Sequence, residues 1–113
     1  MTHNTKALAT FFDADEKRMN FLKAILPIYV QELNKAVVQM KNAYQAKDTD
    51  AFLAIIHKMK GSALTFGAKP VSSECILIED KYELSKDITE IDIEVLLVAV
   101  EELNALFSGE EGN

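Results

Sequence analysis

The sequence predicts an all-α protein: an antiparallel four-helix bundle with a short additional helix at the N-terminus. Apolar residues recur three and four positions apart along nearly the whole chain, which is the spacing of one face of a helix. Only four glycines and two prolines interrupt this pattern, and no Asn-Gly or Asp-Gly hairpin turn is present. Helices joined by short connections pack most naturally as antiparallel neighbours.

The first two predicted helices follow from apolar spacing. A short one covers about Thr5 to Phe12, and a long one runs from about Asp15 to Ala46. Pro27 lies inside the long helix and lacks an N–H donor, so we expect a kink or a break there. The apolar face of the short helix consists of Leu8, Phe11 and Phe12, and that of the long helix of Phe21, Leu22, Ile25, Leu26, Tyr29, Leu33, Val37, Met40 and Tyr44.

The boundaries of the third helix are marked by residues that favour helix ends. Asp48-Thr49-Asp50 is a cluster of N-cap residues. The helix continues to about Phe66 and ends at Gly67, because glycine tolerates a left-handed backbone. The third helix is therefore expected between two well-defined caps.

The last two helices are predicted in the same way. Pro70 suits the first turn of a fourth helix that continues to about Leu84, and Ser85 to Glu90 is a connecting loop. Thr89 and Asp92 resemble a capping box for the last helix. The apolar residues of that helix are Val95, Leu96, Ala99, Val100, Leu103 and Phe107.

Length and composition favour one small domain over residues 1–113. The chain is 49% hydrophobic, which suffices for a single core. Its apolar stretches are far shorter than the roughly 20 residues that cross a membrane, and its N-terminus lacks the features of a secretion signal. We therefore expect a cytoplasmic protein without membrane contact.

Charge and cysteine content argue against several kinds of site. The net charge of −6 is a poor match for nucleic acid, which requires clustered Lys and Arg. Cys75 is the only cysteine, so an intrachain disulfide is ruled out and a cysteine-based zinc site is not expected. Because its neighbours are apolar, Cys75 is interpreted as a small buried hydrophobe.

The third helix places a histidine outside its apolar stripe. At 100° per residue, His57 lies about 140° from the centre of that stripe, so its imidazole is expected to meet water. Lys60 and Gly61 follow at i+3 and i+4, where helix side chains are neighbours. Leu53 and Leu64 fall near the same side. The stripe itself consists of Phe52, Ile56, Met59, Ala63 and Phe66.

This arrangement suits a histidine that carries a phosphoryl group. A neutral imidazole is a nucleophile, and Gly61, although it costs a helix about 1 kcal/mol relative to Ala, leaves the ring accessible. Lys60 could offset the phosphoryl charge, and Leu53 and Leu64 could form a docking surface. The residues alone leave a plainer interpretation open: a surface histidine, a glycine at a close helix contact and ordinary solvated lysines.

A longer pattern of residues around His57 favours the first interpretation. It consists of His57-x-x-Lys60-Gly61-Ser62, Gly67-Ala68, Asp48, Val71, Cys75 and Ile78-Glu79. By this pattern the chain resembles the histidine-containing phosphotransfer (HPt) domain proteins of two-component phosphorelays, most strongly over residues 48–79. Met59 and Val71 stand where that family favours leucine, which is a conservative departure.

The resemblance implies a phosphohistidine carrier. His57 would accept a phosphoryl group from a receiver-domain aspartyl phosphate and pass it to another receiver, with Lys60 stabilising its charge and Gly61 giving access. Mg²⁺ is expected on the partner receiver, and no cofactor or metal on this chain. No Gly-rich nucleotide loop is present, so ATP-dependent kinase activity is not expected. Response-regulator receivers, and a hybrid sensor kinase as a further candidate, are the implied partners of a monomer.

Three alternatives stay open. The chain could be a non-catalytic helical adaptor that docks through Leu53 and Leu64, with His57 incidental. A metal- or cofactor-holding bundle has little support, because His57 points away from the core and no Glu-x-x-His pair is present; His3 is expected to be incidental. The chain could also be a module of a larger sensor kinase.

Overall fold

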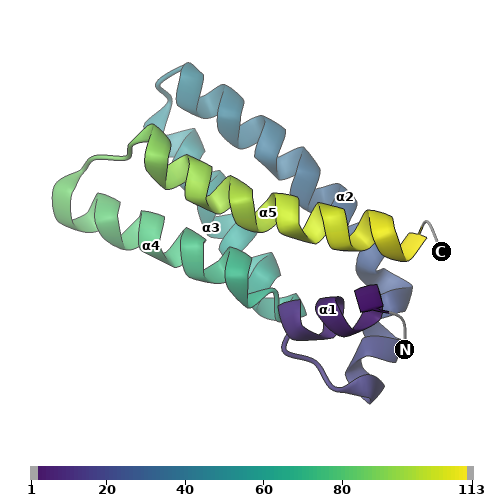
Figure 1. Cartoon of the computed structure of the whole chain (residues 1–113). Helices are drawn as coiled ribbons and strands as arrows, with labels where there is room; N and C mark the ends of the chain where they lie inside the picture. The colour runs from purple at the N-terminus through teal and green to yellow at the C-terminus, as the bar shows by residue number, and fades with distance from the viewer. Residues whose placement is uncertain (1–2, 112–113) are drawn as a thin grey trace.

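Residues 3–111 are described by a computed structural model, with side chains described over residues 5–109. Within residues 3–111 the chain forms five helices and no strand (Figure 1). The helices are α1 (His3–Phe11), α2 (Glu16–Gln45), α3 (Thr49–Phe66), α4 (Lys69–Ser85) and α5 (Glu90–Glu111). The predicted all-α class is confirmed. The side chain of His3 lies outside the described residues.

The four long helices enclose one core. α2 packs against α3 and α5, α3 packs against α4, and α4 packs against α5, while α1 packs against α5 (Figure 1). Asn34 of α2 and Asn104 of α5 exchange two side-chain hydrogen bonds of 2.8 Å. Such a paired amide contact satisfies both groups where they leave water and aligns the two helices.

The predicted core stripe of α3 is confirmed. Its first four members are almost completely buried, and Phe66 is partly buried and packs against the core. Phe66 lies against Tyr29 of α2, with ring centroids 4.5 Å apart. α3 therefore faces the core along its whole length, and its opposite side is left for water. The fully buried members of the stripe are Phe52, Ile56, Met59 and Ala63.

The predicted caps hold α3 in place. Asp48 Oδ1 accepts a hydrogen bond from the backbone N–H of Ala51 at 3.1 Å, which satisfies one of the free donors at the helix start. Gly67 ends the helix at φ +82°. A Cβ atom on Gly67 would lie 3.1 Å from the Phe12 carbonyl oxygen, so both backbone and space favour glycine there.

One expectation for α2 and one for α5 are corrected. Phe21 is 62% exposed, because it lies one residue, or 100°, round the helix from the buried Leu22. α2 continues through Pro27, so of the two outcomes predicted there the break does not occur and the kink stays a prediction. Val95 of α5 is exposed as well, and the neighbouring core position belongs to Ile93.

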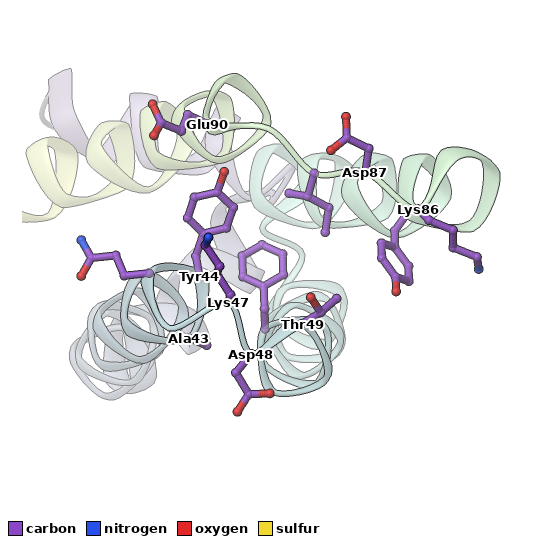
Figure 2. Close-up of a pocket in the computed structure, with 12 residues that line it drawn as sticks. Ala43, Tyr44, Lys47, Asp48, Thr49, Lys86, Asp87 and Glu90 are labelled. Atoms are coloured by element: carbon purple, nitrogen blue, oxygen red, sulfur yellow. The ribbon is translucent and has the colours of Figure 1, made fainter.

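A cavity of about 520 Å³ opens at one end of the bundle. Figure 2 shows the end of α2 and the start of α3 on one side of it and the α4–α5 loop on the other.

Over residues 3–111, none of the helices combines the length and the apolar composition needed to cross a membrane.

Candidate functional site

His57 projects from the side of α3 that faces away from the core. Its side chain is 72% exposed, as the helical spacing predicts, and its Nδ1 lies 3.1 Å from Oε2 of Glu79. Among the described residues no group is hydrogen-bonded to Nε2. One nitrogen of the ring is therefore held by the protein, and the other faces solvent.

Glu79 joins His57 to Lys60. Glu79 belongs to α4, and its second oxygen, Oε1, lies 2.6 Å from Nζ of Lys60. The sequence-based prediction placed the Lys60 ammonium close to whatever the imidazole carries. The structure pairs that ammonium with Glu79, so Lys60 and His57 are linked through the two oxygens of one carboxylate, and the role of Lys60 toward a phosphoryl group stays a prediction.

The charge of Glu79 indicates which ring nitrogen of a neutral His57 carries the proton. Burial opposes ionisation, but hydrogen bonds from Lys60 and from His57 outweigh it and lower the pKa of Glu79. An ionised carboxylate can only accept hydrogen bonds. The proton of a neutral His57 ring must therefore sit on Nδ1, which leaves the lone pair on the exposed Nε2.

Gly61 is open to solvent rather than packed against a neighbouring helix. A Cβ atom built on Gly61 has no heavy atom within 4 Å. The alternative interpretation of this glycine as a close helix contact is therefore wrong. What remains is its position one turn from His57, where any side chain would point toward the imidazole.

The two leucines proposed for docking differ in their surroundings. Leu64 is 58% exposed. Leu53 is half-buried and packs against the hydrophobic core. Of the two, only Leu64 offers most of its side chain to a partner, and Leu53 contributes to the fold as well as to the surface.

Glu79 was not among the residues singled out for chemistry in the sequence. It stands 22 residues after His57 and reaches it only because α3 packs against α4. Its place after Ile78 in the family pattern was a signal, but nothing in the spacing specified its contacts. Cys75, one turn earlier on α4, is fully buried, and burial raises the pKa of its thiol to about 12. Its interpretation as a buried hydrophobe is confirmed.

The remaining features do not compete with this cluster. The cavity at the bundle end is lined by other residues than the predicted site residues. Within the part of the chain that the structure describes, no group of three His, Cys, Asp or Glu residues could hold a metal ion.

Comparison with known proteins agrees with the geometry. The model of the Hpt domain family matches residues 24–108, which include α3, α4 and most of α2 and α5. No curated protein and no solved structure gives a significant match. Because the matched region covers most of the chain and includes His57, Lys60, Gly61 and Glu79, the chain belongs to the Hpt domain family, the helical-bundle family of phosphorelay histidine phosphotransfer.

Proposed function

We propose that this chain is a phosphorelay intermediate that carries a phosphoryl group on Nε2 of His57. It receives the group from an aspartyl phosphate of one receiver domain and delivers it to the aspartate of another. The observation that carries the proposal is the hydrogen bond between Nδ1 and the ionised Glu79, on a ring that is otherwise exposed. This contact leaves the nucleophilic lone pair on the nitrogen that a partner can reach.

The transfer step balances with the residues at hand. The Nε2 lone pair forms a bond to phosphorus while the bond to the aspartyl oxygen breaks in line, and the electron pair leaves with the aspartate carboxylate. The ring, now phosphorylated on Nε2, keeps its proton on Nδ1 and becomes positively charged. Glu79 stabilises that charge through the existing hydrogen bond. Reverse attack by a second receiver returns His57 to its neutral form.

Lys60 and Gly61 have supporting roles in this proposal. The Lys60 ammonium stands one turn from His57 and can offset part of the phosphoryl charge, although it must share its charge with Glu79. Gly61 leaves space for the receiver to approach the ring. Mg²⁺ belongs to the receiver, where it would stabilise the transferring phosphoryl group.

The proposal also covers partners and setting. Receiver domains of response regulators, and of a hybrid kinase, would dock over the exposed His57 and Leu64. We expect a cytoplasmic monomer. We also expect each of the four long helices to run antiparallel to the next one along the chain, because connections of only a few residues join them.

Transfer of label from a phosphorylated receiver tests this function. The full chain should acquire acid-labile label, His57→Gln should acquire none, and His3→Gln should behave like the parent. Circular dichroism of His57→Gln should remain that of the parent, because the exposed ring supports no core contact. If the parent binds phosphorylated receivers but never becomes labelled, the chain is a non-catalytic adaptor instead.

A further inference from the structure

Charge is unequally divided along the chain. Residues 1–68 contain nine basic and six acidic residues, whereas residues 69–113, from the start of α4, contain three basic and twelve acidic residues. The net charge of the second segment is therefore −9, against +3 for the first. α5 has no Lys or Arg at all. The surface formed by α4 and α5 is therefore acidic, and of its carboxylates only Glu79 contacts His57 in the structure.

α5 also exposes a row of apolar side chains on this acidic surface. Ile91, Val95 and Val98 stand at positions i, i+4 and i+7, which places them on one face of the helix, and all three are exposed. The core side of α5 is formed by other residues, including Leu96 and Leu103. The exposed row therefore has no partner within the described chain.

α4 carries a second apolar row. Leu77 and Leu84 are exposed and lie seven residues apart, with Lys81 between them on the same side of the helix. Lys81 donates a hydrogen bond to Asp92 of α5, with 2.8 Å between Nζ and Oδ2. Because Asp92 adjoins the α5 row in sequence, this bond places the two rows side by side. We refer to Leu77, Leu84, Ile91, Val95 and Val98 together as the α4–α5 face.

The other end of the same helix pair shows what can cover such a surface. α1, whose Leu8 and Phe11 are buried, packs against α5, and its end borders a shallow pocket together with Lys69 and Pro70 at the start of α4. In Figure 1, α1 lies by the C-terminal half of α5, away from the α4–α5 loop. The five residues of the α4–α5 face are instead exposed, and no helix of the described chain covers them.

We propose that the α4–α5 face binds a basic amphipathic helix of a partner protein, at a site separate from His57. The apolar rows would receive the apolar side of that helix. Its Lys and Arg residues would lie close to the acidic residues near the rows. These acidic residues attract a basic partner and repel an acidic one. The exposed acidic residues nearby on the two helices are Asp80, Glu83, Glu90, Glu94 and Glu102.

The same charges argue against the other occupants. A symmetric pair of copies would bring two acidic α4–α5 faces together, which electrostatic repulsion opposes. An anionic membrane would be repelled for the same reason. A basic helix is the partner that gains from both the apolar rows and the surrounding charge.

A model peptide tests the proposal on the full chain. The probe is a helical peptide of Lys and Leu, about 18 residues or five turns long, with its leucines on one face. A scrambled peptide of the same composition and a Glu/Leu peptide serve as controls. Binding is measured by calorimetry and located by amide chemical shifts. We expect the Lys/Leu peptide alone to bind, with shifts confined to the α4–α5 face and the residues of α4 and α5 that adjoin it.

Two matched variants locate the site independently. Val98→Lys and Val38→Lys each add one positive charge at an exposed valine, 64% exposed on α5 and 59% exposed on α2. We expect Val98→Lys to weaken peptide binding by about tenfold or more, as removal of a central interface contact does, and Val38→Lys to bind nearly like the parent. Both should accept phosphoryl groups normally.

Three outcomes would overturn the proposal. The first is equal weakening by both variants, which would mean that only overall charge matters. The second is mapping of the peptide onto residues around His57. The third is a dimer of the parent chain, seen by sedimentation, that Val98→Lys dissociates, because a second copy would then be the occupant.

Discussion

At the scale of single residues, one carboxylate organises the candidate site. Glu79 accepts hydrogen bonds from both His57 and Lys60, so it sets the tautomer of the imidazole and also neutralises the adjacent cation. In the phosphorylated state the Glu79 carboxylate would stabilise the charged ring but repel the phosphoryl group. The stabilisation should prevail, because the carboxylate is hydrogen-bonded directly to Nδ1, whereas a phosphoryl group on Nε2 is farther away across the ring.

Removal of the Glu79 carboxylate should change the tautomer of His57. In the parent, ring ¹⁵N shifts should report a neutral form protonated on Nδ1, and Glu79→Ala should give a mixture of the two tautomers. Phosphoryl acceptance should slow, since part of the population then carries its proton on Nε2. Glu83→Ala, also on α4 but exposed, is the control. An unchanged tautomer in Glu79→Ala would show that this carboxylate does not position the ring.

Substitution of Gly61 should separate access from stability. Gly61→Gln should lower the rate of phosphoryl acceptance, because a side chain one turn from His57 obstructs the approaching receiver. The melting temperature should be equal or higher, since the site is open and Gly costs a helix about 1 kcal/mol relative to Ala. Gly61→Ala should keep more activity than Gly61→Gln. A clear drop in melting temperature would contradict this account of the glycine.

Leu64 and Leu53 should respond differently to truncation. Leu64→Ala should weaken receiver binding with little salt dependence, because burial of apolar area contributes about 25 cal/mol per Å², and its melting temperature should stay near that of the parent. Leu53→Ala should lower the melting temperature, since Leu53 packs against the core. Calorimetry and thermal denaturation of both variants measure this difference. A Leu64→Ala variant that melts like Leu53→Ala would place Leu64 in the fold instead of the interface.

The residues of the site differed in how far the sequence revealed them. The exposure of His57 and Leu64 follows from 100° steps around a single helix, so local spacing was sufficient. The contacts of Glu79 depend on how α3 and α4 pack, and spacing within one helix contains no information about that. The same limit applies to Lys60. Its position one turn from His57 was predicted from spacing, but its ion pair with Glu79 was not.

At the scale of helices, boundaries were predictable wherever a cap residue makes a specific hydrogen bond. Asp48, Gly67 and the Thr89–Asp92 pair all act as expected. The assignment of Phe21 to the core face failed for a different reason. Phe21 lies at the edge of the apolar face of α2, and the helical pattern alone does not show how far the neighbouring helices cover that edge.

Asp92 should make the free energy of unfolding depend on pH in the acidic range. The hydrogen bond from Lys81, followed by that from the Thr89 backbone, lowers the pKa of Asp92 in the folded protein. The folded state therefore binds fewer protons than the unfolded state, so this stabilisation is complete above the ordinary pKa near 3.8 and is lost as pH falls through the lower folded value. Asp92→Asn should lose at most about 1 kcal/mol at pH 7, because Asn can still accept hydrogen bonds from Thr89 but cannot form the part-exposed ion pair with Lys81.

Urea denaturation at pH 7 and pH 3 checks this expectation. Asp92→Asn should lose less stability than the parent on acidification, because the titrating group is gone. Glu79→Gln should also lose less stability than the parent on acidification, as the pKa of Glu79 is lowered on folding as well. Asp50→Asn serves as the control, because the Asp50 carboxylate has no hydrogen-bond or ion-pair partner among the described residues. Equal acid sensitivity of the parent and Asp92→Asn would assign the effect to other carboxylates.

At the scale of the whole molecule, the bundle separates two surfaces. His57 and its neighbours lie where α3 packs against α4, and the α4–α5 face lies beyond α4 near the loop. The all-helical class was predictable because the apolar period is helical throughout. The division of charge was visible in the sequence only as a count, since the packing of α4 against α5 is what gathers the acidic residues around exposed apolar rows.

The most direct measurement of the central claim is the chemical identity of the phosphorylated atom. The full chain, labelled with ¹⁵N in its histidine rings, is incubated with a phosphorylated receiver and examined by ³¹P and ¹⁵N NMR. We expect one phosphorus bonded to Nε2 of His57, with the proton retained on Nδ1 beside Glu79. A phosphoryl group on Nδ1, on His3, or on no histidine while the receiver loses its phosphate would contradict the account.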